Sequence, residues 1–170
     1  MNPPQQSVHI DLPSGRFRPA RWGARLSARI LDGVIVGIPV GVLAVFILAE
    51  STPDSGYSGD SAATVAAALL IGALAVAVEG LYEIAFVAAS GSTPGKRVLG
   101  LRIVNADVSS PPRDGTGTEP AFTRWAVLAI PGVLSGGLWL LPCAVSCLRG
   151  GAGRQGWHDR AARTYVIAER

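Results

Sequence analysis

The stretch AATVAAALLIGALAVAVEGLYEIAFVAA, residues 62–89, decides the fold class of this chain. It is longer than the roughly 20 apolar residues that a helix needs to cross a hydrocarbon core of about 30 Å. A second stretch of the same kind, LSARILDGVIVGIPVGVLAVFILA, covers residues 26–49. Both are predicted to be transmembrane helices, and we therefore expect an all-α polytopic membrane protein.

A third apolar segment, AFTRWAVLAIPGVLSGGLWLLPCAVSCL at residues 121–148, is interrupted by glycine and proline. The pairs Pro131-Gly132 and Gly136-Gly137, together with Pro142, are of the kind that bends or ends a helix. The segment is long enough for one tilted crossing. The alternative is a kinked hairpin or re-entrant segment that bends at these residues, its irregular backbone covered by protein.

The composition also indicates a membrane protein. With 49% hydrophobic and 16% charged residues, the chain is too apolar for an ordinary soluble domain, and 170 residues correspond to one domain. We expect a flexible tail over residues 1–20 and a membrane domain over 21–170, with the lipid bilayer as its main partner. The net charge of +3 comes from basic residues that flank the apolar segments, so nucleic acid is not expected as a partner.

Basic flanking residues predict the orientation. Four arginines lie between residues 16 and 25, whereas the loop at residues 50–61 is acidic and has no basic residue. The N-terminus of a multi-pass cell-membrane protein is therefore expected in the cytoplasm. Segments 90–120 and 149–170 are also basic, which places the C-terminus on the same side, in conflict with three simple crossings.

Two short stretches are typical of β-strands, VLGLRIV at residues 98–104 and TYVIA at residues 164–168. A lone strand is not stable in water, so we expect the two to pair on the cytoplasmic side. Such a pair requires both stretches on one side of the membrane, which favours the hairpin for the third segment.

Charged residues inside the apolar helices are costly in lipid and normally face protein or water. In the first helix, Arg25, Arg29 and Asp32 share one face at spacings i, i+4 and i+7. In the second, Glu79 and Glu83 share a face. In antiparallel helices Asp32 and Glu83 lie at one level, about 9 Å below the cytoplasmic surface. A charge network that docks the two helices is one interpretation, and ion or proton coupling is the other.

Glu79 lies deeper than the other carboxylates, roughly 15 Å from that surface. No basic residue of either helix is expected to reach it easily. It is therefore the first candidate for binding and releasing a proton or a cation, and Glu83 and Asp32 are further candidates.

A repeat of small residues, Gly33, Gly37 and Gly41, forms a smooth ridge along the first helix. Such a ridge lets another helix approach closely, and the alanine-rich second helix matches it. The ridge is equally suited to a homodimer. We therefore assign the three glycines to helix packing.

The loop ASGSTPGKRVLGLRIV, residues 89–104, has the glycines and Gly-Lys pair typical of phosphate-binding loops. Gly91 and Gly95 are one residue too close for that motif, and Arg97 stands where a hydroxyl is required. The preceding segment is a membrane helix, whereas a phosphate loop follows a buried strand. No nucleotide is expected.

Three stretches resemble the RDD family of membrane proteins, named for an arginine and two aspartates: ARLSARILD at 24–32, GSTPGKRVLGLRIVNAD at 91–107 and RQGWHDRAARTYVI at 154–167. The resemblance covers nearly the whole chain beyond the tail. It implies that Arg25 is the family arginine, Asp32 the first aspartate and Asp159 the second. Arg124 resembles an arginine that the family tends to carry where the third segment begins, and with Arg29 we assign it to the charge network. One departure is Arg163, where many relatives carry a small residue. The turn of Thr93, Pro94, Gly95, Lys96 and Arg97 is among the more specific parts of the pattern.

Members of the family are thought to take part in transport, including cation/proton exchange. The resemblance therefore implies a small transporter of ions or small solutes. Two or three short helices can scarcely enclose a pathway, so such a transporter is expected to be a homo-oligomer or to join another membrane protein.

The alternative is a non-transporting scaffold or assembly factor. It would dock a partner or lipid headgroups through the basic face of Lys96, Arg97, Asp159 and Arg160. The sequence assembles no nucleophile with its base and no metal shell, so we expect no enzyme activity, no metal and no cofactor.

Overall fold

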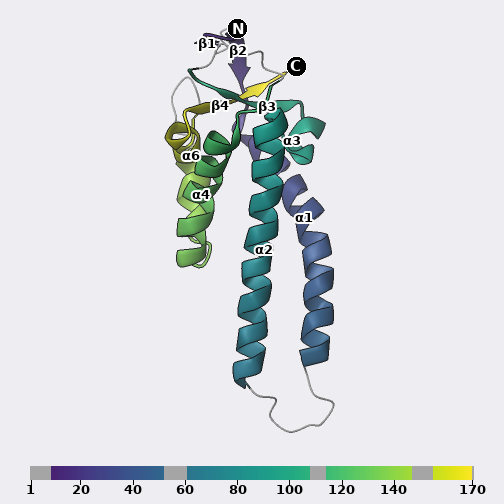
Figure 1. The fold of residues 1–170 in the computed structure, drawn as a ribbon. Coiled ribbons are helices and arrows are strands. Elements are labelled where there is room, and N and C mark those ends of the chain that lie inside the picture. The colour runs from purple at the N-terminus through teal and green to yellow at the C-terminus, as the bar shows by residue number, and fades with distance from the viewer. Residues whose placement is uncertain (1–8, 52–60, 108–113, 147–154, 170) are drawn as a thin grey trace, which may run out of the picture.

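The computed structural model describes residues 9–51, 61–107, 114–146 and 155–169. Residues 1–8 of the expected tail and residues 147–148 of the third apolar segment lie outside the described residues, as do parts of the charged loops used to predict the orientation. Figure 1 shows a long helical hairpin with a small sheet at one end, where both termini lie.

The hairpin consists of α1 (Trp22–Ser51) and α2 (Ser61–Ser90), each 30 residues long. At 1.5 Å per residue each helix is about 45 Å long, which exceeds the thickness of a hydrocarbon core. Only 6% of the apolar part of each helix is buried, and side chains such as Phe46 and Leu69 are 66% and 70% exposed. A soluble protein would bury such helices in its core. Both predicted helices are confirmed as long and apolar enough to cross a membrane.

The third apolar segment folds back on itself. It forms α4 (Thr118–Leu134) and α5 (Leu140–Ser146), and this second hairpin is shorter than the first (Figure 1). The reversal occurs at Gly136 and Gly137, whose φ angles of 59° and 90° lie in the left-handed region that favours glycine. The structure thus has the kinked hairpin and not the single crossing.

The other two predicted sites do not end a helix. Pro131 and Gly132 lie inside α4, and Pro142 lies inside the first turn of α5. A proline cannot donate to the carbonyl four residues earlier, here that of Val127. The Trp139 indole N–H donates to this carbonyl at 3.0 Å, so the hydrogen bond missing from the helix is replaced from the returning chain.

The sheet has four antiparallel strands in the order β1-β2-β4-β3. The predicted pair is confirmed as β3 (Leu101–Asn105) and β4 (Thr164–Ala168), in a register that sets Leu101 opposite Ala168. Strands β1 (Ile10–Leu12) and β2 (Gly15–Pro19) occupy part of the stretch expected to be a flexible tail. Strand β3 covers only one edge of β4. Strand β2 pairs with the other edge, with Arg18 opposite Ala168, so that neither edge of β4 is left open. The fold is therefore mostly helical with a small sheet, and not all-α.

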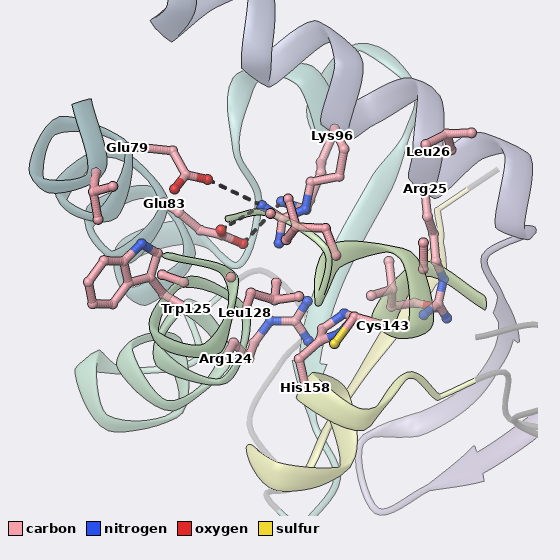
Figure 2. A pocket seen from close by; sticks show the side chains of 18 of the residues that line it. Arg25, Leu26, Glu79, Glu83, Lys96, Arg124, Trp125, Leu128, Cys143 and His158 are labelled. Atoms are coloured by element: carbon pink, nitrogen blue, oxygen red, sulfur yellow. Dashed lines mark hydrogen bonds and ion pairs between the residues drawn. The ribbon is translucent and has the colours of Figure 1, made fainter. Parts of the chain in front are cut away.

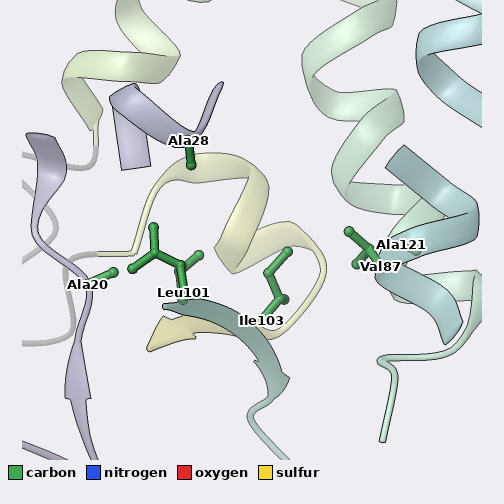
Figure 3. Close-up of a cluster of buried hydrophobic side chains, with 7 residues drawn as sticks. Ala20, Ala28, Val87, Leu101, Ile103 and Ala121 are labelled. Atoms are coloured by element: carbon green, nitrogen blue, oxygen red, sulfur yellow. The ribbon is translucent and has the colours of Figure 1, made fainter. Parts of the chain in front are cut away.

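Two short helices link the two helical hairpins to the sheet, α3 (Pro94–Val98) and α6 (Trp157–Ala161). Apolar side chains are fully buried where the sheet meets the ends of α1, α2 and α4 (Figure 3). Ala28 from α1 and Val87 from α2 are each 0% exposed there, as is Ile103 from β3. This small core fixes the helix ends that hold most of the charged residues.

Candidate functional site

Asp32 is buried, only 7% exposed, at the end of the long hairpin that faces the sheet, and it contacts the turn of residues 93–97. Thr93 Oγ1 donates to Asp32 Oδ2 at 2.6 Å, and the Gly95 backbone N–H donates to Oδ1 at 2.9 Å. From α2, the Tyr82 hydroxyl also donates to Oδ1 at 2.8 Å. A buried carboxylate needs several hydrogen-bond donors, and those of Asp32 come from α2 and from the start of α3. Asp32 therefore connects α1 to both of these helices.

Glycine is required at position 95 by this contact. A Cβ atom there would lie 2.7 Å from both the Ala28 carbonyl oxygen and Asp32 Oδ1. Any side chain would push the turn away from α1. The sequence pattern Thr-Pro-Gly thus encodes a hydroxyl donor, a helix start and a close approach of the backbone.

Lys96 is directed inward, although it was assigned from the sequence to an exposed basic face. It is 4% exposed, and its Nζ lies 3.7 Å from both Asp32 Oδ2 and Glu83 Oε1. These contacts place Asp32 and Glu83 at one level, as the antiparallel arrangement predicts. Burial lowers the pKa of the Lys96 ammonium to about 8, against the opposing effect of Glu83, so the group is mainly charged at neutral pH.

Arg29 connects the same acidic residues from α1. Its Nη1 lies 2.6 Å from Glu83 Oε2 and 3.9 Å from Glu79 Oε1. The expectation that no basic residue reaches Glu79 was therefore wrong, because an arginine side chain is long enough to extend toward the membrane centre. We call Asp32, Arg29, Glu79, Glu83 and Lys96 the Asp32 cluster.

Asp159 forms a second cluster with two arginines. It is 0% exposed, and Arg25 Nη1 contacts its Oδ2 at 2.7 Å while Arg124 Nη1 pairs with its Oδ1. The Gly156 N–H donates to Oδ2 at 3.1 Å, and Arg124 Nη1 also donates to Thr164 Oγ1 at 2.8 Å. Asp159 thus connects α1, α4 and α6, and we call Arg25, Arg124 and Asp159 the Asp159 cluster.

The ionisation of this second cluster follows from its neighbours. Burial alone would raise the pKa of the Asp159 carboxyl, but Arg124 above all holds it well below its usual range. His158 Nε2 lies 3.4 Å from Asp159 Oδ1, and burial lowers the pKa of this imidazole to about 4. At neutral pH the histidine is therefore uncharged, and Asp159 is shared by the two arginines.

A cavity of about 680 Å³ lies between the two hairpins, beside both clusters (Figure 2). Its walls come from α1, α2, α4 and α5, and Leu101 and Val166 of the sheet close one end. Most lining side chains are apolar, including Leu26, Leu128 and Leu140. The Trp22 indole N–H donates to the Ala144 carbonyl at 2.9 Å and so holds α5 against α1. The charged residues on the wall are Arg25, Arg29, Glu79, Glu83, Lys96 and Arg124.

A model of the RDD family matches residues 19–163. The chain belongs to the RDD family. Comparison with curated proteins and with solved structures yields no match. The three residues assigned from the resemblance, Arg25, Asp32 and Asp159, do not converge on one point in this RDD protein. Arg25 pairs with Asp159, whereas Asp32 binds the turn of α3.

Arg29 and Arg124, which the sequence analysis assigned to one charge network, lie in separate clusters, Arg29 with Glu83 and Arg124 with Asp159. The structure adds Tyr82 as a partner of Asp32, for which the sequence carries no signal beyond its position on the same face of α2 as Glu79. It also adds the cavity, which arises only because α4 and α5 fold back. In the described part of the chain, no group of three histidine, cysteine or acidic side chains is arranged to hold a metal ion.

The glycine ridge does not pack against α2 within this RDD chain. Among the described residues, and apart from the backbone of α1 itself, no heavy atom lies within 4 Å of the Cβ position of Gly33, Gly37 or Gly41. The two long helices contact each other through the charged face near the sheet instead. Arg163, the departure from the family pattern, has a φ of 49°, in the left-handed region where small residues are favoured.

Proposed function

We propose that this RDD protein is a small membrane transporter of ions or small solutes, with Glu79 as the carboxylate that binds and releases the coupling proton or cation. One observation carries the proposal. Glu79 is the acidic residue of the cavity wall whose side chain is 49% exposed, and its ion pair with Arg29 is long at 3.9 Å. A carboxylate with a weak partner and open surface is free to exchange what it binds.

The other carboxylates of the two clusters are better suited to holding the helices together. Glu83 and Asp159 have side chains that are 3% and 0% exposed, and each contacts an arginine within 2.7 Å. Asp32 accepts three hydrogen bonds. Exchange at any of these sites would leave buried charges without partners, which costs about 3–5 kcal/mol. We therefore assign Asp32 and Glu83 to docking, and keep Glu79 as the coupling residue.

The proposed topology has both termini in the cytoplasm and the two long helices crossing the cell membrane. The pairing of β2 with β4 supports the common side, since it brings the N-terminal and C-terminal parts of the chain together. The arginines before α1 support the cytoplasmic side. We further propose a homo-oligomer, with the uncovered glycine ridge available to a second copy.

The scaffold alternative has weaker support. Of the four residues that were to form its basic docking face, Lys96 and Asp159 are buried and bound to other side chains. Arg97 and Arg160 are exposed, but two arginines on separate short helices are an ordinary charged surface.

Proton and sodium flux in proteoliposomes tests the proposal. The purified protein is compared with Glu79→Gln and with Glu119→Gln, the same chemical change at an exposed residue in the first turn of α4. We expect flux in the unmodified protein and in Glu119→Gln, and its loss in Glu79→Gln. Equal flux in all three proteins would reject Glu79 as the coupling residue, and no flux of any tested cation would reject transport.

A further inference from the structure

The cavity is much larger than an inorganic ion requires. One water molecule occupies roughly 30 Å³, so a cavity of about 680 Å³ corresponds to some twenty waters. Its walls are mainly hydrocarbon, including Leu26 on α1, Leu128 on α4 and Leu140 on α5, and apolar cavities hold water poorly. The volume falls within the range of about 300–1,000 Å³ that is usual for organic ligands. The occupant that fits is therefore an organic molecule with an apolar body.

The wall carries both signs of charge, since Arg25, Arg29, Lys96 and Arg124 line it together with Glu79 and Glu83, and side-chain exposure decides which of these groups a ligand meets. In the Asp32 cluster, two basic side chains, Arg29 and Lys96, face three acidic ones, Asp32, Glu79 and Glu83. Asp32 and Glu83 have side chains that are 9% and 3% exposed, so the surplus negative charge is presented at Glu79.

The basic residues on the same wall offer little surface to a ligand. The side chains of Arg124 and Arg25 are 2% and 11% exposed, and both bind Asp159 through Nη1. Arg29 is more open but lies 2.6 Å from Glu83. The arginine atoms that have no hydrogen-bond partner, Arg29 Nη2 and the Nε atoms of Arg25 and Arg124, are buried. An anionic ligand would have to open the packing around these atoms, whereas a cationic ligand meets the exposed Glu79 carboxylate without breaking a short ion pair.

An aromatic ring lies beside Glu79. Trp125 of α4 packs against Gly80, the residue that follows Glu79 on α2, so closely that a Cβ atom at Gly80 would be 2.7 Å from the ring. Figure 2 shows Trp125 on the same side of the cavity as Glu79. The N–H edge of the indole is turned toward Glu79, so Trp125 adds a flat apolar surface beside the carboxylate against which the body of a ligand can pack.

We propose that the cavity binds lipophilic organic cations, with the charged centre at Glu79 and the apolar body along Trp125, α4 and α5. This inference rests on the proposed transport function and names its solute class. The exchange is balanced in charge: when the organic cation leaves Glu79, one proton from water takes its place, and the reverse exchange returns that proton.

Equilibrium binding to the purified full-length protein in detergent micelles tests the inference. The probes are tetraphenylphosphonium and tetraphenylborate, which share size and shape and differ in the sign of the charge. Isothermal titration is corrected with protein-free micelles. We expect saturable binding of tetraphenylphosphonium alone, weakened about tenfold or more in Glu79→Gln and unchanged in Glu119→Gln. Equal affinity in Glu79→Gln, or binding of tetraphenylborate as tight as that of the cation, would overturn the inference.

A second variant tests the cavity without touching a charge. Ala129 lines the cavity on α4, and Ala129→Phe fills part of its volume. We expect this variant to lose tetraphenylphosphonium binding while it keeps its helical circular dichroism. Retained binding in a folded Ala129→Phe protein would place the cation elsewhere and overturn the inference.

Binding and transport can fail separately, because the titration contains no gradient. Tetraphenylphosphonium binding that depends on Glu79, without any flux in proteoliposomes, would support the site and reject the transporter. Proton or sodium flux that depends on Glu79, without tetraphenylphosphonium binding, would leave the transporter standing and reject the solute class.

Discussion

The hydrogen bond from Trp139 to the Val127 carbonyl should matter only because residue 131 is proline. In Trp139→Phe the indole N–H is lost and the Val127 carbonyl is left without its donor. A fully buried group left in this way costs about 1–3 kcal/mol in soluble proteins, hydrogen bonds between membrane helices average about 0.6 kcal/mol, and this hydrogen bond is partly buried. We expect a loss of about 1 kcal/mol in the free energy of unfolding. In Pro131→Ala the alanine N–H supplies the helical hydrogen bond, so Trp139→Phe should then cost about 1 kcal/mol less.

The measurement is a double-mutant cycle, with unfolding by sodium dodecyl sulfate in mixed micelles followed by far-ultraviolet circular dichroism. The Trp157 ring packs against Trp139, with ring centroids 5.5 Å apart, so Trp157→Phe is the matched control. This control should cost the same whether or not the chain also carries Pro131→Ala. The reasoning is refuted if Trp139→Phe costs equally in both backgrounds, to within about 0.3 kcal/mol.

Three other changes near the site have predictable outcomes. Gly95→Ala should lower the unfolding free energy by about 1–3 kcal/mol, since its Cβ would collide with Asp32, whereas Gly23→Ala, where a Cβ atom meets no neighbour within 4 Å, should not; thermal unfolding in detergent measures both. Gly80→Ala should displace the Trp125 ring and lower the unfolding free energy by a similar amount. Gly72→Ala on the same helix should be neutral or slightly stabilising, because a Cβ atom there meets no neighbour. A lower denaturation midpoint for Gly72→Ala than for Gly80→Ala would contradict this. Burial lowers the pKa of His158 to about 4; Arg124 and Arg29 act in the same direction, and Asp159 and Glu83 oppose it. Between about pH 6.5 and 4 the unfolded chain therefore binds a proton that the folded chain does not. Stability should therefore fall as the pH drops through this window, and the melting temperature of His158→Gln should fall less over the same range.

Much of the helical framework and of the site could be predicted from the sequence, because length, periodicity and charge spacing act locally. The two long helices could be predicted from the length of their apolar stretches alone. The pairing of β3 with β4 could be predicted because a lone strand is unstable. The level shared by Asp32 and Glu83 followed from the rise per residue in antiparallel helices. The turn of the third segment was indicated by Gly136-Gly137, while Pro131 resembles a break and is accommodated by Trp139.

The features that were missed depend on contacts between distant parts of the chain. Lys96 stands in a turn beside Arg97 and looks exposed; only the close approach of Gly95 to α1 turns it inward. Strand β2 could not be predicted from its own sequence, because its formation depends on the edge of β4 that β3 leaves open. The contact of Arg29 with Glu79 depends on side-chain length more than on backbone depth, and the uncovered glycine ridge depends on where the helices actually touch.

The position of Asp159 has a consequence for the biogenesis of the protein. Arg25 and Arg124 both bind this one carboxylate, and ribosomal synthesis delivers it after both arginines have already left the ribosome with their helices. A buried guanidinium group without a partner is costly, so the ends of α1 and α4 can pack together as they do here only with α6 in place. A chain that stops before Asp159 is therefore expected to leave both arginines without the carboxylate that they share.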